Sequence, residues 1–500
     1  MRYSSALRGA VSVTAILAAS AAHADVTAQQ VWDDWKSQME IYGEDGLSIG
    51  SEAMSGDTLT VSDIVLTFED DEVEVVSQIG DLTFVEQGDG SVRVTMDESY
   101  PIVITGEDGV VITIDVSQSG LEMIASGDPE AMNYDFTADS YSIAFRDAVD
   151  GGMTYTGDAR LTMTNMAGSY AMNIGEMRDI VSEATVGSVD VLVDFQIPGG
   201  EGEYVTGAAK LANLAMQFDG TVPLEIDGDN PEEMFADGFA IAGGYTIDSG
   251  DYVFDINSEG DQASGSVSTG QVALTGEFNS QTIAYASSTK DTQLTMQTAE
   301  FPLPIELSLA EYGIGFRMPV GQTEEPAPFG ISFDMVDLEI SEMLWSIFDP
   351  NAVLPRDPAT LQIALAGTAR ALIDLMDPEN AEAFESTEVP FEPYTLTLDT
   401  LRISAAGALV TGSGAFTFDN DDTETFAPMP RPEGDATVEI SGLNQLLDNL
   451  VAMGLVPQDQ IMGPRMMMGM FARSTGDDQM EISVEVTPSG EVNVNGNRVR

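Results

Sequence analysis

The stretch SVDVLVDFQI, residues 188–197, decides the fold class of this chain. Its apolar side chains stand at every second position, and three of the four residues between them are Asp or Gln. The apolar residues are Val189, Val191, Val193, Phe195 and Ile197. A period of two residues is typical of a β-strand that buries one face. The stretch therefore predicts an amphipathic strand.

The same alternation recurs along the chain, in residues 110–116, 252–256, 305–318 and 394–404. Turn-like sequences stand between many of these runs, such as QGDG at 87–90, GEDG at 106–109 and TPSG at 487–490. Short turns between strands give hairpins, whose strands are antiparallel. We therefore expect a mainly β fold of about 20 mostly antiparallel strands with a few short amphipathic helices.

The number of strands limits the architecture. At about 4.8 Å per strand, about 20 strands in one flat sheet would span about 95 Å, whereas twisted open sheets rarely exceed about 10 strands without curling or splitting. The sheet is therefore expected to be curled or divided into two parts. A Pro-rich segment at 321–328 is the candidate linker between a β-rich part at 25–320 and a second β part with helices at 329–500. The alternative is one continuous domain over 25–500.

Helical patterns are few. Residues 27–43 open with a capping box from Thr27 to Gln30, and residues 441–454 carry an apolar stripe with Ser441 as the expected N-cap. Further helices are predicted at 341–348, 367–384 and 465–473. Each is expected to lay its apolar side on the sheet, including the methionine-rich segment with Met466, Met467, Met468 and Met470.

The first 24 residues have the three parts of a secretory signal. Arg2 and Arg8 make the first region positively charged, a short apolar run follows, and the small residues Ala22 and Ala24 stand on either side of His23. We expect cleavage between Ala24 and Asp25 and an exported product. No later apolar run approaches the roughly 20 residues of a spanning helix, so no transmembrane segment is expected in the mature chain.

Cleavage would remove His23, the single histidine, from a chain that has no cysteine. Catalytic triads that use histidine, cysteine–histidine pairs and most zinc or copper sites would then be excluded. Hard oxygen ligands would remain, so no tightly bound transition metal and no cofactor are expected. The sequence offers no catalytic, cofactor-binding or metal-binding residue.

The charge excludes further classes. The chain has 18 Lys and Arg against 84 Asp and Glu, a net charge of -66. Such a surface repels nucleic acid and anionic lipid headgroups. Two acidic runs, 68–74 and 418–426, could offer carboxylates to calcium, but in the second Thr423 and Glu424 stand where a ligand and the turn glycine belong. Both are predicted to be hairpin tips.

Two enzyme readings remain to be weighed. Ser287 and Lys290 match an S-x-x-K spacing, but the surrounding sequence is predicted to run strand, turn, strand, and the companion motifs of that class are missing. A pair of carboxylates acting on a glycan needs no histidine. Among 84 acidic residues the sequence selects no such pair. A carboxylate-only hydrolase therefore stays as an alternative.

The C-terminal part carries a family resemblance. LWSIFDPNAVLPRDPATLQIALAG (344–367), NQLLDNLVAMGLVPQDQIMGPRMMMGMFAR (444–473) and the closing VEVTPSGEVNVNGNRVR (484–500), with the start ADVTAQQVWDDWKSQM (24–39), resemble an exported bacterial family, domain of unknown function 2125. The resemblance implies a periplasmic location and a β-rich fold over nearly all of the mature chain, and it transfers no site. A looser similarity to AsmA-type envelope proteins implies long apolar-lined β surfaces.

Three functions follow. The first is a periplasmic, non-enzymatic protein that binds a lipid or other hydrophobic ligand; the others are a structural or partner-binding envelope component and the hydrolase. The first is preferred because a few helices cannot cover the apolar faces of about 20 strands. The candidate lining residues are Val189, Val191, Val193, Phe195, Ile305, Leu307 and Leu309.

Overall fold

A computed structural model describes residues 25–39, 46–69, 73–106, 109–129, 131–196, 202–224, 238–258, 260–301, 303–376, 380 and 390–500. The predicted signal peptide, including Ala24, lies outside the described residues. Asp25 is the first residue that the structure describes, and the backbone N–H of the next residue, Val26, donates a hydrogen bond to the carbonyl of Gly90 at 3.1 Å.

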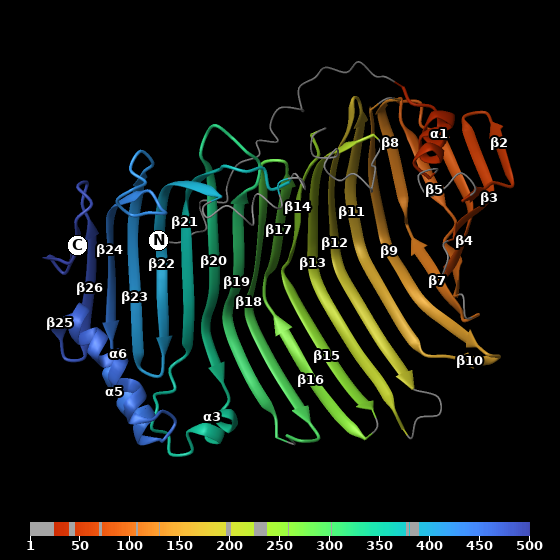
Figure 1. Ribbon diagram of the computed structural model, residues 1–500. Helices are drawn as coiled ribbons and strands as arrows, with labels where there is room; N and C mark the ends of the chain where they lie inside the picture. The colour runs from red at the N-terminus through yellow and green to blue at the C-terminus, as the bar shows by residue number, and fades with distance from the viewer. Residues whose placement is uncertain are drawn as a thin grey trace.

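The described strands form one antiparallel sheet of 28 segments, which confirms the predicted mainly β, mostly antiparallel fold and exceeds the expected number of about 20 strands. Figure 1 shows them side by side in nearly chain order, from the red N-terminal strands to the blue C-terminal ones. Their bounds in the first half are β1 (Leu47–Ser48), β2 (Ser51–Ser55), β3 (Thr58–Glu69), β4 (Val73–Glu86), β5 (Val92–Met96), β6 (Ser99–Gly106), β7 (Val111–Ser119), β8 (Glu122–Asp128), β9 (Ala131–Asp150), β10 (Met153–Tyr155), β11 (Asp158–Ile174), β12 (Met177–Gln196), β13 (Tyr204–Pro223) and β14 (Ala240–Ile247).

In the second half they are β15 (Ser249–Ser258), β16 (Asp261–Thr269), β17 (Val272–Asn279), β18 (Thr282–Thr298), β19 (Ile305–Pro319), β20 (Ala327–Ile340), β21 (Ala359–Ala371), β22 (Phe391–Ala405), β23 (Ala408–Asp419), β24 (Arg431–Ser441), β25 (Arg473–Gly476), β26 (Gln479–Val486), β27 (Val492–Val494) and β28 (Asn497–Arg498). The segment at 321–328, proposed as a linker, lies between β19 and β20 and includes the first two residues of β20; these two strands pair with each other. The division into two parts stays a prediction.

The strands bend along one line that crosses the sheet, which we call the bend line. Five strand residues on this line have a left-handed φ of 50–57°: Asp63, Asn165, Asn213, Asp291 and Asp337. Asn and Asp are the non-glycine residues that adopt this conformation most readily. Their neighbours across the ladder include Gly187 and Gly270, where an added Cβ would lie 3.1 Å from Asn165 and 3.2 Å from Asp291. The bend line curls the sheet.

The alternation of side chains changes phase at the bend line. In β19 the apolar residues 305, 307 and 309 are followed by 312, 314, 316 and 318. In β12 the buried Val186 and Val189 are three residues apart, on either side of Gly187. An extra residue at a kink resets which face a strand presents. One face of the sheet therefore stays apolar on both sides of the bend.

Helix α1 (Ala28–Met39) covers the apolar face near the N-terminal end. The predicted capping box is present: the backbone N–H of Thr27 donates to Gln30 Oε1 at 2.9 Å, and that of Gln30 donates to Thr27 Oγ1 at 3.3 Å. Val31 and Trp32 are completely buried, and Trp32 contacts the Phe84 ring with a centroid distance of 5.8 Å. The main cluster of buried apolar residues in the described chain lies here.

The other helices are α3 (Glu342–Phe348), α5 (Leu443–Ala452) and α6 (Gln458–Phe471). The first two confirm the helices predicted at 341–348 and 441–454. The helix predicted at 465–473 is confirmed over 465–471, but α6 starts before Pro464 and Arg473 belongs to β25. The helix predicted at 367–384 is wrong over 367–376, because residues 367–371 belong to β21, where Ala369 and Ala371 are buried, and residues 372–376 form bends and turns. Pairing with β22 overrides the local helical pattern there. Residues 377–379 and 381–384 lie outside the described residues.

Short strands finish the sheet at both ends. Beyond β3 stand β1, with two residues, and β2, with five. Beyond β26 stand β25, with four residues, and β27, with three. The long strands are therefore flanked on the outside by short ones, a common arrangement at natural sheet edges.

Candidate ligand groove

The two predicted sets of lining residues lie on the same face of the sheet. Residues paired directly across an antiparallel ladder point to the same side. Val191 pairs with Ala209, and the row continues strand by strand to Leu307. The row consists of Leu161, Val191, Ala209, Tyr252, Val267, Leu294, Leu307 and Ile340.

A neighbouring row joins the other members of the two sets. Val193 and Ile305 are linked through Gly207, Phe254, Gly265 and Met296. Phe195, one step further along β12, contacts the Phe145 ring at a centroid distance of 5.2 Å. The sets were separated by more than a hundred residues in sequence, and the register aligns them. We call the face that carries these rows the apolar face.

The opposite face carries a row of polar side chains, although the exposed Leu192 and Val253 also lie on this face. The row next to Val191 on the other side runs through Asp190, Lys210, Asp251, Ser268, Gln293 and Ser308. Lys210 Nζ lies 3.6 Å from Asp190 Oδ1. The carboxylates that give the chain its charge thus alternate with the apolar residues along the same strands, and the sheet separates the two kinds of side chain.

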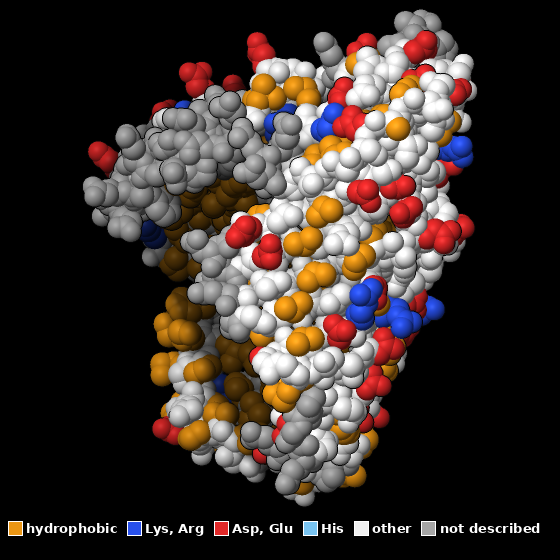
Figure 2. Space-filling model, turned by 90° about the vertical axis from the view of Figure 1, so that its right-hand side faces the viewer, with side chains coloured by type: hydrophobic (Ala, Val, Ile, Leu, Met, Phe, Trp, Pro, Cys, Tyr) orange, Lys and Arg blue, Asp and Glu red, His pale blue; other side chains and the backbone are white. Residues whose placement is uncertain are grey.

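The apolar face is only partly covered. Val189 is 7% exposed, whereas the other six candidate residues are partly exposed. Beyond the bend line the face carries large apolar side chains that are more exposed still: Met216, Phe218, Tyr312, Ile314, Phe316, Met318 and Ile331, at 36–55%. Figure 2 shows a hollow lined by hydrophobic side chains beside an outer surface where acidic and other polar groups are frequent. This hollow is the candidate groove.

These seven residues were not among the predicted lining residues. Their signal was present in β19, where 312, 314, 316 and 318 continue the alternation after a one-residue shift. Phe316 pairs with Tyr285 and Ile331, and the Tyr285 and Phe316 rings stack at 6.2 Å. These residues can be found from the sequence if a one-residue shift of the alternation is interpreted as a bend that leaves the apolar residues on the same face.

Gly276 of β17 marks open space above the apolar face. It lies in the same row as Gly243 and Tyr285. An added Cβ at Gly276 would have no neighbour within 4 Å among the described atoms, and its φ is not left-handed. The row therefore has room for a larger group at this position.

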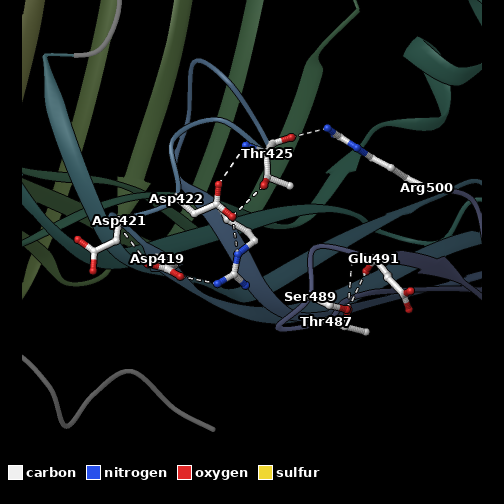
Figure 3. Close-up of polar contacts among 9 residues, drawn as sticks. Asp419, Asp421, Asp422, Thr425, Thr487, Ser489, Glu491 and Arg500 are labelled. Carbon is white, nitrogen blue, oxygen red and sulfur yellow. Dashed lines mark hydrogen bonds and ion pairs between the residues drawn. The ribbon is translucent and has the colours of Figure 1, made fainter.

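The acidic run at 418–426 is a hairpin tip, as predicted, because Asp419 of β23 pairs with Arg431 of β24. Figure 3 shows how its carboxylates are used. Asp422 accepts hydrogen bonds from the backbone N–H of Thr425 at 3.0 Å and from Arg431 Nε at 3.0 Å, and these bonds hold its pKa below the usual value. Asp419 also binds Arg431, and Arg500 donates to the Thr425 carbonyl. The cluster ties the C-terminal end to the hairpin.

The run at 68–74 also joins paired strands, since Glu69 of β3 pairs with Glu74 of β4, and residues 70–72 lie outside the described residues.

The strand–turn–strand expected around Ser287 is wrong: β18 continues through Ser287 and Lys290 and bends at Asp291. Residues three apart in a strand point to opposite faces, so these two side chains do not form a catalytic pair.

The methionine-rich segment was expected to face the sheet, and this is wrong. In α6 Ile461 is buried, while Met466, Met467 and Met470 are 62–68% exposed.

Among the residues that the structure describes, no group of three or more His, Cys, Asp or Glu side chains is arranged to hold a metal ion. Within the same residues, no helix has the length and apolar character needed to cross a membrane.

Comparison with known proteins identifies one family. Residues 246–488 match the model of an uncharacterized protein conserved in bacteria, DUF2125. Searches of curated proteins and of solved structures gave no match. The looser similarity to AsmA-type envelope proteins has no support in these comparisons. The match covers β14 to β26, so it includes Ile305, Leu307 and Leu309 and the exposed residues of β19 but not the set in β12. Over residues 246–488 the chain is therefore similar to the uncharacterized bacterial family DUF2125.

Proposed function

We propose that this protein is exported to the periplasm and, without catalysing a reaction, binds a lipid or a similar hydrophobic ligand along its apolar face. One observation carries the proposal. The rows from Leu161 to Ile340 make the face continuous across the sheet, yet its large side chains beyond the bend line remain 36–55% exposed. Contiguous exposed apolar surface on this scale usually marks a binding site.

The energetics favour such a ligand. Removing apolar surface from water contributes about 25 cal/mol per Å², so an acyl chain that covers about 200 Å² of protein would gain about 5 kcal/mol from that side alone. The polar outer face keeps its carboxylates in water, while the apolar face offers few of them. Binding of a hydrocarbon chain is therefore favourable on the apolar face and unfavourable on the opposite face, where it would desolvate carboxylates.

Export is the second part of the proposal and rests on residues 1–24. The cut after Ala24 would leave Asp25 as the first residue, two positions before the capping box at Thr27. N-terminal sequencing of the protein recovered from the periplasmic fraction should give DVTAQQ. A product that still begins at Met1, or one found in the cytoplasmic fraction, would remove this part of the proposal.

Ligand binding is tested with two neighbouring residues of β12. Val191 belongs to the apolar face, whereas Leu192 points to the opposite face and is 41% exposed. Native mass spectrometry of the purified protein is expected to show co-purified lipid, and fluorescent ANS bound to the folded protein should be displaced by phospholipid. V191E should lose most of this uptake, and L192E should keep it.

Circular dichroism of both variants establishes that each is folded before uptake is compared. Equal uptake by V191E and L192E, or no uptake by the native protein, would contradict the groove. A structural or partner-binding role would then account better for the apolar face.

A further inference from the structure

Helix α6 presents a row of methionine side chains to solvent. Met462, Met466, Met467 and Met470 are 62, 62, 62 and 68% exposed, while Ile461 on the inner side of the helix is 4% exposed. Exposed methionine is unusual because the side chain is apolar and usually fills gaps in a core. The groove described above does not account for these residues, since α6 contacts α5 and the C-terminal strands.

The spacing of the four residues places their side chains on neighbouring turns of one helix. Met462, Met466 and Met470 follow one another at four-residue intervals, and Met467 stands three residues before Met470. Side chains at these separations on a helix have Cβ atoms about 5–6 Å apart. Methionine has a flexible side chain, so three thioethers from Met466, Met467 and Met470 can meet at one point outside the helix.

The charges around this row favour a cation. Within α6 the charged residues are Asp459 and Arg465. Arg465 is held on the α5 side, where its guanidinium lies 2.7 Å from Asp448 Oδ1 and donates to the Asn444 carbonyl at 3.2 Å. The methionine row is thus uncharged itself and belongs to a chain with a net charge of -66, whose field attracts cations.

We propose that Met462, Met466, Met467 and Met470 form a thioether site for Cu(I), with Met466, Met467 and Met470 as the central ligands. Thioether sulfur is a soft ligand that selects Cu(I) over the harder divalent ions. A search for metal ligands that considers only cysteine and histidine does not find this site. Binding is coordination alone, with no electron transfer, and it is independent of the lipid groove.

Silver, a soft monovalent ion that does not change oxidation state here, serves as the probe. The purified protein is dialysed against silver nitrate in chloride-free buffer, and bound silver is measured by elemental analysis. About one silver ion per chain is expected above the weak background of the carboxylates. With methionine labelled at the ε-methyl carbon, the NMR signals of the α6 methionines should shift, and those of other methionines should not.

The decisive variant is M466L/M467L/M470L. Leucine keeps the volume, the apolar character and the helix propensity of methionine but lacks sulfur. This variant should lose the bound silver ion while its circular dichroism is unchanged. The matched control is M54L/M153L, which replaces two exposed methionines of β2 and β10 and should bind silver as the parent does.

Two results would overturn the proposal. One is equal silver binding by the parent and the triple leucine variant, which would assign the ion to carboxylates. The other is the absence of any shift in the α6 methyl signals at saturating silver. The exposed row would then be an apolar contact surface, a role that leucine preserves.

Discussion

The backbone N–H of Asn444 donates a hydrogen bond to Asp478 Oδ1 at 3.1 Å, although 34 residues separate the two in sequence. The other carboxylate oxygen, Oδ2, accepts from the backbone N–H of Gln445 at 3.0 Å. The first turn of α5 is therefore capped by a residue from the turn between β25 and β26. Gly442, in a left-handed conformation, occupies the N-cap position and supplies no side chain.

Replacing this distant cap should destabilise the C-terminal region. D478A is expected to lower the free energy of unfolding by at least about 1 kcal/mol, because it leaves two backbone donors of α5 without their acceptor and places alanine at a left-handed φ of 47°. S441A removes the residue that the sequence indicated as the cap and should have little effect. Urea unfolding followed by circular dichroism compares the two; equal losses would contradict the assignment of the cap to Asp478.

The same carboxylate predicts a pH dependence. Its partial burial by itself would raise the pKa, but hydrogen bonds from Gln445 and Asn444 stabilise the charged form, and the pKa of Asp478 lies below its usual value. Its contribution to stability is therefore present above the unfolded-state pKa, near 4, and is lost as the pH falls through the folded-state pKa. The stability difference between the parent and D478A, measured from pH 6 downward, should shrink below about pH 4. A difference that grew in acid would contradict this sign.

The bend line predicts which substitutions a strand tolerates at its kink. Asn165 has a φ of 52°, which glycine adopts freely and valine does not. N165G should unfold at nearly the parent urea concentration, and N165V should lose about 1–2 kcal/mol. If N165V were as stable as N165G, the left-handed residue would not be what the bend requires.

Filling the groove should reduce ligand uptake without unfolding the protein. G276W would place an indole ring in the open space above the apolar face, and the backbone conformation there accepts a side chain. ANS and phospholipid uptake are expected to fall several-fold. T275W changes the adjacent residue, which faces the other way, and should leave uptake unchanged. If G276W binds as much ligand as T275W, the ligand does not lie along this row.

Period-two alternation predicted the strands well, because successive side chains of a strand point to opposite faces and one face of this sheet is apolar. The apolar sets in β12 and β19 could therefore be identified as strand faces from the sequence. Their alignment on one face could not, because it depends on the register of every strand between them. The exposed side chains from Tyr312 to Met318 were missed because the bend shifts the alternation by one residue.

The errors arose where a distant contact decides the outcome. Residues 367–371 were assigned to a helix from their local pattern, but β22 pairs with them and extends β21. The N-cap of α5 comes from Asp478 rather than from the adjacent Ser441. The methionines of α6 form an apolar stripe that normally indicates burial, but Ile461 is the buried residue of that helix and Met466, Met467 and Met470 are exposed.

The short strands at the two ends of the sheet limit edge-to-edge association between molecules. Amyloid-like growth needs a long, unpaired strand on which another chain can add hydrogen bond after hydrogen bond. Here an incoming strand would meet two residues at β1 and five at β2, or four at β25 and two at β28, which pairs with β27. A protein with this many strands in one open sheet can thereby remain a discrete particle at high local concentration, while its wide inner face stays open.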